Sequence, residues 1–139
     1  MGLIGLSMDR TPDRINGFRL LETEGNFTVE ADVVAMGQDL LVIVQGGRSH
    51  IGAIGVGLPR QGLKDPGTIS ATSSVFTFLG HKEDGLVKSM SERLAAHFNR
   101  KVVVIAGIHW DDLKAEEIVS IVELCERVTG KIIIWGEDT

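Results

Sequence analysis

The segment from Phe27 to Ala35 alternates apolar and polar residues, which is the period of a strand with one buried face. A shorter apolar segment, Phe18 to Thr23, precedes it, and Gly25-Asn26 between the two is typical of a two-residue hairpin turn. The pattern predicts an antiparallel hairpin near the start of the fold. Its inward face would carry Phe27, Val29, Ala31, Val33 and Ala35.

The stretch Leu40 to Pro59 joins two apolar runs through a polar, glycine-rich bend at residues 46–50. We expect a second hairpin here, with one strand on each side of the bend. Gly55 and Gly57 leave one face of the outgoing strand without side chains, so a packed helix, a bend of the sheet or another group can approach closely. Thr68 to Leu79 then predicts a strand rich in Ser and Thr, suited to a sheet edge or to the wall of a polar cleft.

The second half of the chain has a different spacing of apolar residues. Asp84 to Asn99 has apolar residues at helical spacing, and Lys101 to Ala106 is continuously apolar, as in a strand covered on both faces. Glu116 to Thr129 predicts a second helix, and Lys131 to Trp135 a last strand. We expect this helix to have Asp112 as its N-cap, Gly130 as its stop, and Ile118, Ile121, Val122, Cys125 and Val128 facing inward.

Antiparallel strands followed by the order helix, strand, helix, strand predict a two-layer α+β fold, also described as a two-layer α/β fold. Its mixed, mainly antiparallel sheet would carry both helices on one face, with the last two strands parallel through a right-handed crossover. We expect a single domain over residues 17–139 and a flexible N-terminal arm over residues 1–16. The apolar strands also need cover on the other face, which a second copy would supply in a homodimer.

Composition narrows the classes of function. The chain has 139 residues, 43% of them hydrophobic and 24% charged, which is ordinary for a globular protein. A net charge of −5 without a Lys/Arg cluster argues against nucleic acid as the partner. The single cysteine, Cys125, excludes an intrachain disulfide and favours a reducing compartment. With neither a membrane-length apolar run nor a signal-peptide pattern, we expect a cytoplasmic protein that binds no membrane.

Three polar bends each carry one histidine beside an apolar segment: His50, His81 and His109. If the bends converge, the imidazoles would form a shared site for an organic ligand or, alternatively, a three-histidine metal site; separately they would be strand-end residues. The glycines of the first bend and Arg48 suit an anion, although the bend is neither a Walker loop nor a Rossmann fingerprint. A plain hairpin turn also explains it. Trp110 would stack on a flat ligand or pack at the sheet edge.

No nucleophile with an adjacent base is recognisable. Cys125 falls on the buried stripe of a helix, and Ser49 is next to His50 only in sequence. Asp111 and Asp112 would form an acid/base pair, but helix capping explains Asp112 more simply. We therefore expect no catalytic residue.

Four short motifs together resemble a known family: Gly46-Gly47, His50-Ile51-Gly52, His81-Lys82 with a following acidic residue, and Ala106-Gly107-Ile108-His109. The chain resembles the LpdD-like prenylated flavin chaperones, small accessory subunits of gallate and hydroxybenzoate decarboxylases of the UbiD type. The resemblance implies a fold like that of the proteasome assembly chaperones, often paired into dimers. It also implies a role in handling prenylated FMN for a UbiD-like decarboxylase subunit, without catalysis by this chain.

On this hypothesis the chain binds prenylated FMN or FMN transiently. Glycine N–H groups and Arg48 would hold the phosphate, the histidines and Lys82 the polar edges of the ring, and Trp110 would stack. Two alternatives stay open: a small metal-dependent hydrolase built on His50, His81 and His109, and an assembly chaperone acting through protein–protein contacts only. The candidate cofactor-binding residues are Gly46, Gly47, Arg48, His50, Gly52, His81, Lys82, Gly107, His109 and Trp110, with no metal ligand among the expected roles.

Overall fold

A computed structural model describes residues 16–78 and 83–137 of the chain. The expected arm, apart from residue 16, lies outside these ranges, and so do His81 and Lys82. In chain order the elements are β1 (Gly17–Glu24), β2 (Phe27–Met36), β3 (Asp39–Gly47), β4 (Ala53–Gln61), β5 (Ile69–Thr77), α1 (Asp84–Phe98), β6 (Val102–His109) and α2 (Ala115–Glu137).

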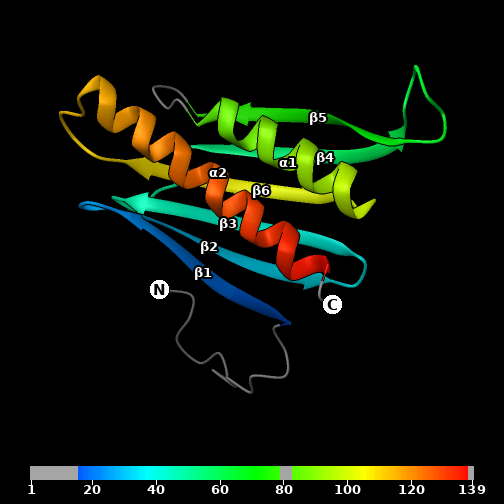
Figure 1. Ribbon diagram of the computed structural model, residues 1–139, viewed down its shortest axis with the longest axis horizontal. Coiled ribbons are helices and arrows are strands. Elements are labelled where there is room, and N and C mark those ends of the chain that lie inside the picture. The colour runs from blue at the N-terminus through cyan, green and yellow to red at the C-terminus, as the bar shows by residue number, and fades with distance from the viewer. Residues whose placement is uncertain (1–15, 79–82, 138–139) are drawn as a thin grey trace, which may run out of the picture.

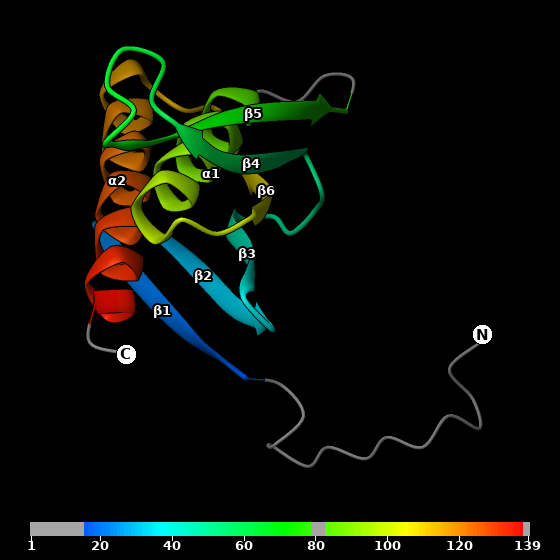
Figure 2. The same cartoon turned by 90° about the vertical axis from the view of Figure 1, so that its right-hand side faces the viewer.

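The strands form one mixed, mainly antiparallel sheet in the order β1-β2-β3-β6-β4-β5 (Figure 1). β3 and β6 are parallel, and every other neighbouring pair is antiparallel. Both helices lie on the same face of this sheet (Figure 2). The predicted fold class, an α+β fold of two layers, is confirmed.

The first hairpin forms as its alternation predicts. Glu24 is paired with Phe27 across the turn, where Gly25 adopts a left-handed φ of 59°. Val29, Ala31 and Val33 are buried against the helices, while the residues between them are only partly buried. Ser- and Thr-rich β5 lies at the sheet edge, one of the two places predicted for it.

The second predicted hairpin, over Leu40 to Pro59, is wrong. β3 and β4 flank the bend but do not pair with each other, because β6 lies between them. Ala106 of β6 is paired with Val44 of β3 on one side and with Ala53 of β4 on the other. An apolar strand buried on both edges satisfies its backbone groups and removes more apolar surface from water than a local turn would.

The predicted last strand, Lys131 to Trp135, is also wrong, because α2 continues without a break to Glu137. The expected crossover to a final parallel strand is therefore absent from the described chain. Ile132 is fully buried and Trp135 packs on Phe18 with ring centroids 4.2 Å apart, whereas Ile134 is exposed. That spacing is helical, so contact with the sheet overrides the strand propensity of three consecutive isoleucines.

Both predicted ends of this helix need correction. Gly130 does not stop the helix but lies inside α2, which continues for seven residues beyond it to Glu137. Asp112 is not the N-cap: it has a left-handed φ of 55° and lies before the helix. The carboxylate of Glu117 instead accepts a hydrogen bond from the backbone N–H of Lys114, 2.8 Å away, which satisfies one free donor at the helix start.

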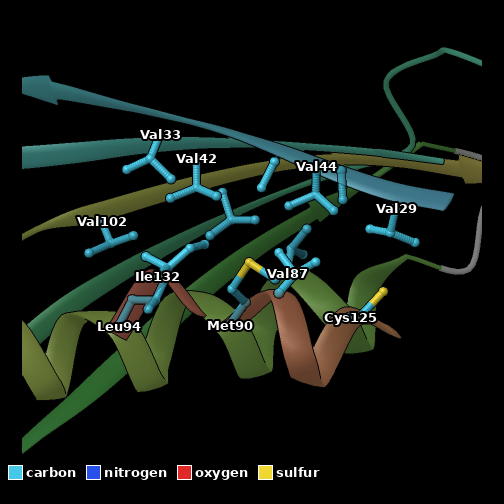
Figure 3. Close-up of a cluster of buried hydrophobic side chains, with 14 of the residues drawn as sticks. Val29, Val33, Val42, Val44, Val87, Met90, Leu94, Val102, Cys125 and Ile132 are labelled. Carbon is cyan, nitrogen blue, oxygen red and sulfur yellow. The ribbon is translucent and has the colours of Figure 1, made fainter. Parts of the chain in front are cut away.

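The core lies between the sheet and the two helices (Figure 3). α1 packs on β4, β5 and β6, and α2 packs on β1 and β2. At Gly55 a Cβ would come within 2.6 Å of the carbonyl oxygen of Val87 in α1. A packed helix thus explains the glycine face of β4, as one of the predicted alternatives held.

The opposite face of the sheet has no helix over it in the described part of the chain (Figure 2). Strand alternation places on it half-buried apolar side chains of the three central strands. These are Leu41, Ile43, Ile54, Val56, Val103 and Ile105. No helix of the described residues is long and apolar enough to cross a membrane.

Candidate functional site

Two of the three histidine bends meet at one edge of the sheet. β3 and β6 are parallel, so their carboxyl ends lie together, and Gly47 is paired with His109. The backbone N–H of Arg48 donates to the carbonyl oxygen of His109 at 2.9 Å. The rings of His50 and His109 lie 6.3 Å apart between centroids, nearly perpendicular to each other.

The third bend reaches the same place through Glu83. His81 and Lys82 lie outside the described residues, but the side chain of the next residue contacts both other bends. Glu83 Oε1 lies 3.1 Å from His50 Nε2 and accepts a hydrogen bond from the backbone N–H of Ile108, also at 3.1 Å. The predicted convergence therefore holds for His50 and His109, and Glu83 brings the third segment to them.

Both ring nitrogens of His50 have hydrogen-bond partners that orient the ring. Nδ1 lies 3.0 Å from the carbonyl oxygen of Arg48, which only accepts, so Nδ1 carries a hydrogen. Nε2 faces Glu83 Oε1, and that contact also requires one proton. Oε1 also accepts from the Ile108 N–H, so one carboxylate oxygen contacts both neighbouring bends.

The second carboxylate oxygen of Glu83, Oε2, differs from Oε1 in its surroundings. The Glu83 side chain is only 8% exposed, and Oε2 is a buried oxygen with no hydrogen-bond partner among the described residues. Buried carboxylate oxygens are normally paired because leaving one unpaired in a low-dielectric site is costly. Oε2 lies against Gly52, where an added Cβ would collide with it, so this oxygen is enclosed by the protein.

A second histidine–carboxylate pair lies on the surface beside the first. His109 Nε2 is 2.9 Å from Asp111 Oδ1, and an Arg48 guanidinium nitrogen is 3.3 Å from the same oxygen. The hydrogen bond with His109, followed by the positive charges of Arg48 and His109, lowers the pKa of Asp111 below its ordinary value. Arg48 thus lies at the site, with its side chain mostly exposed.

The predicted glycines serve contacts between the bends. A Cβ on Gly107 would run into the carbonyl oxygen of His50, and one on Gly46 would lie 2.8 Å from the ring of Trp110. The backbone N–H groups of Arg48 and Gly52 are already bonded to carbonyl oxygens of β6. These contacts explain the glycine pattern without an anion, but the bend is not the plain hairpin turn of the alternative, because β6 lies between β3 and β4.

Trp110 packs at the sheet edge, one of its two predicted roles. Its ring lies against Gly46 and meets Phe27 edge to face, with centroids 5.1 Å apart. Trp110 and His109 also line a cavity, so the histidine cluster adjoins it.

That cavity, of about 650 Å³, is a cleft between α1 and α2 beside the carboxyl end of β6. Sequence reasoning missed it and placed Ile118 and Val122 in the core, whereas they are 50% and 55% exposed where they line the cleft. The apolar stripe of α2 is wider than one helix–sheet contact needs, and that width was the available signal. The lining residues are Glu83, Gly85, Leu86, Ser89, Met90, Ile108, His109, Trp110, Leu113, Ile118, Ile121, Val122, Cys125, Glu126 and Thr129.

Cys125 and the acidic residues do not form a metal centre in the described part of the chain, where no group of three or more candidate ligands is close enough to hold an ion. Burial raises the pKa of the Cys125 thiol to about 12, with a smaller contribution from Glu126. The thiol therefore stays protonated at neutral pH, as expected for an inert buried cysteine.

The profile of the prenylated flavin chaperone LpdD-like domain matches residues 23–137, a range that holds all the elements described above except most of β1. The chain belongs to this family. It is 24% identical over 113 residues to Protein LpdD of Lactiplantibacillus plantarum, covering 81% of this chain and 79% of that protein. The resemblance drawn from the three bends is confirmed.

Family membership and the fold agree. The LpdD-like chain is similar in structure to a chain in the crystal structure of a novel chaperone complex for yeast 20S proteasome assembly. The TM-score is 0.56 at 11% identity, over 85% of this chain and 94% of the other. At that identity the similarity concerns the fold alone, and it confirms the predicted proteasome-assembly-chaperone-like arrangement.

Proposed function

We propose that this protein is a chaperone-type accessory subunit that binds a prenylated FMN cofactor transiently and presents it to a UbiD-like decarboxylase subunit. Membership of the prenylated flavin chaperone family supports the chaperone role. The observation that carries the proposal is the position of the His50–Glu83–His109 cluster beside an apolar cleft of ligand size. The bound flavin would supply its chemistry to the decarboxylase, and this chain would only hold it.

The cleft fits the ring system of a flavin in size and polarity. Small-molecule sites have volumes of roughly 300–1,000 Å³, mostly apolar walls and a few placed polar groups. The volume of about 650 Å³ lies within that range. Leu86, Met90 and Ile121 supply apolar wall, and buried Glu83 supplies a polar group.

The surface residues suit the phosphate end. Arg48 is mostly exposed, and its guanidinium pairs with Asp111 in a screened contact that a phosphate can replace. His109 lies between this surface and the cleft, where its ring would contact a polar ring edge. Gly46, Gly47, Gly52 and Gly107 would act by shaping the bends, and the candidate roles of His81 and Lys82 belong to the same proposal.

Flavin titration tests the binding step. Purified protein is added to FMN and to prenylated FMN, and the change in flavin fluorescence gives the dissociation constants. We expect His109→Ala to weaken binding about tenfold, the loss of one charged hydrogen bond. His97→Ala is the matched control, because His97 lies on α1 and pairs with Glu137, away from the cleft. Absence of binding by either flavin would overturn the proposed cofactor role.

The face of the sheet opposite the two helices supports a second role, which is contact with other proteins. Its half-buried apolar side chains suit a second copy of the chain, in a homodimer, or the decarboxylase subunit. Light scattering during gel filtration measures the oligomeric state. Leu58→Glu and Phe76→Glu, both on exposed positions of this face, should shift a dimer to monomer, whereas Leu63→Glu in a loop should not. A wild-type monomer would leave the decarboxylase as the proposed occupant, tested by co-purification.

A further inference from the structure

The two edges of the sheet differ in how they are protected from pairing with another chain. At one edge, β1 carries Arg19, Glu22 and Glu24, and Glu22 is paired with Lys131 of α2 at 3.3 Å. The amine of Lys131 also lies 3.5 Å from the carbonyl oxygen of Leu21. Charged side chains and a covering helix are common ways in which proteins block a sheet edge. The edge at β1 is therefore protected against an incoming strand.

In the described chain β5, at the other edge, lacks these protections. Its nine residues, Ile69 to Thr77, include no charged residue and no proline, and their register with β4 runs without a bulge. β4 lies beside β5 and α1 covers one of its faces, so the outer edge is left open (Figure 1). Val75 and Phe76 are 39% and 62% exposed although both are apolar. A long, uncharged and partly apolar edge is typical of a strand that pairs with another chain.

The hydrogen bonds to β4 indicate which backbone groups of β5 point outward. The N–H of Phe78, just after β5, donates to the carbonyl oxygen of Gly52, just before β4, at 3.0 Å. Successive residues of an antiparallel strand direct their backbone groups to opposite sides, so Ala71, Ser73 and Val75 direct theirs away from β4. The edge thus presents a row of backbone donors and acceptors to a strand from another molecule.

We infer that β5 pairs antiparallel with β5 of a second copy of this chain, about a two-fold axis at Ser73. This register overlaps the whole strand, Ile69 to Thr77, with itself. It places Thr72 of one copy opposite Ser74 of the other, where two hydroxyls can hydrogen-bond, and no like charges meet because β5 has none. A second copy is the occupant because every copy brings the same unprotected strand, and a two-fold axis lets each satisfy the other.

This interface is separate from the flavin site and from the face of the sheet opposite the two helices. The inference therefore goes beyond the proposed function and stands whether or not the chain binds a flavin. If copies also associate through the face opposite the helices, the assembly is a tetramer with two kinds of interface.

A proline at an outward position tests the pairing. Val75→Pro removes an N–H that points away from β4, so the chain's own sheet keeps its hydrogen bonds. Light scattering during gel filtration should give half of the wild-type mass, a monomer from a dimer or a dimer from a tetramer. From a tetramer, adding Leu58→Glu should then give the monomer. Leu21→Pro is the matched control, because the Leu21 backbone faces away from β2 at the protected edge, and it should leave the mass unchanged.

Hydrogen exchange measured by NMR tests the same contact without a substitution. The Ser73 N–H should exchange about tenfold more slowly at a protein concentration at which β5 is paired than at one at which it is not. The Ser74 N–H points toward β4 and should be protected at both concentrations.

Charge reversal keeps the inference testable if circular dichroism shows that Val75→Pro does not fold. One chain carries Thr72→Lys with Ser74→Lys, and another carries Thr72→Glu with Ser74→Glu. Each alone should have half of the wild-type mass, because like charges lie opposite one another, and an equimolar mixture should restore it.

Four outcomes would overturn the inference. They are a monomeric wild type, a folded Val75→Pro with the wild-type mass, Ser73 exchange that does not depend on concentration, and a charged mixture that stays at half mass. None of these outcomes bears on flavin binding, so the failure of this inference and the failure of the proposed function are distinguishable.

Discussion

Two histidine–carboxylate pairs lie side by side at the carboxyl ends of β3 and β6, and their environments differ sharply. The side chains of His50 and Glu83 are 20% and 8% exposed, whereas those of His109 and Asp111 are 44% and 74% exposed. The N–O distances are similar, at 3.1 and 2.9 Å. The same chemistry therefore gives a buried pair that ties three segments together and a surface pair that water and salt screen.

Burial also determines what each pair can do for a ligand. The exposed pair can exchange Asp111 for another anion at little loss, because water solvates whatever is released. The buried pair cannot exchange partners, because Glu83 is enclosed between the bends that it joins, with Oε2 lying against Gly52. The first pair suits a charged group arriving from solution, and the second holds the bends in place.

Removing Glu83 should produce the largest effect. Glu83→Ala leaves the His50 ring and the Ile108 N–H without their buried partner, so we expect the free energy of unfolding to fall by about 3 kcal/mol. Urea denaturation followed by circular dichroism measures the change. Asp111→Ala is the control and should leave the midpoint within error of the wild type. Equal losses in the two variants would show that burial does not separate the pairs.

Gly107→Ala should disturb the buried pair without touching its chemistry. The new Cβ would collide with the carbonyl oxygen of His50 and push that bend away from Glu83. We expect a loss of about 2 kcal/mol, typical of overpacking against a rigid neighbour. Gly85→Ala, where nothing lies within 4 Å of the added Cβ, should cause no loss in the same urea experiment. A neutral Gly107→Ala would mean that the contact between the bends is loose.

Cys125 extends the contrast to a third titratable group, on the wall of the cleft. Burial raises its pKa from 9.0 to about 12, so folding favours the protonated thiol. Its contribution to stability is complete below pH 9, where the unfolded chain is also protonated, and is lost as pH rises from 9 to 12. At pH 10 the wild type should have lost about 1.4 kcal/mol relative to Cys125→Ala. Parallel curves for the two proteins would contradict the burial of the thiol.

The smallest effect should appear at the exposed pair. NMR titration should find the pKa of the Asp111 carboxyl below its ordinary value, and His109→Ala should raise it, because the hydrogen bond with His109 is the main cause of the shift. Its stabilising contribution is present above the ordinary Asp pKa and disappears as pH falls through the lowered one. High salt should reduce the part due to Arg48. A shift that survives His109→Ala would assign it to Arg48 instead.

Local patterns predicted much of the fold. The alternation in Phe27–Met36, the Gly25-Asn26 turn and the helical spacing of α1 each depend on neighbours in sequence, and each appears as predicted. Two errors arose where apolar runs carry no period. Leu40 to Pro59 has two strands joined by a bend, and nothing within it says that β6 will separate them. The isoleucines at 132–134 favour a strand, but their helical contacts with the sheet outweigh that preference.

The candidate site was also predicted only in part. His50 and His109 were found from their positions at strand ends, and the structure brings them together. Glu83 was passed over as one acidic residue after His81, because only its burial and its contacts with His50 and Ile108 distinguish it. The cleft was missed because it lies between two helices, and the sequence of neither helix determines the distance between them.

The sequence by itself determined which segments are amphipathic, where the hairpin turn at Gly25 falls, and which bends carry histidine, because these features depend on residues a few positions apart. Only the tertiary structure decided that β6 separates β3 from β4, that α2 continues to Glu137, and that Glu83 meets His50. These outcomes depend on contacts between residues distant in the chain. Their free energy comes from burial shared by several elements, which no single segment encodes.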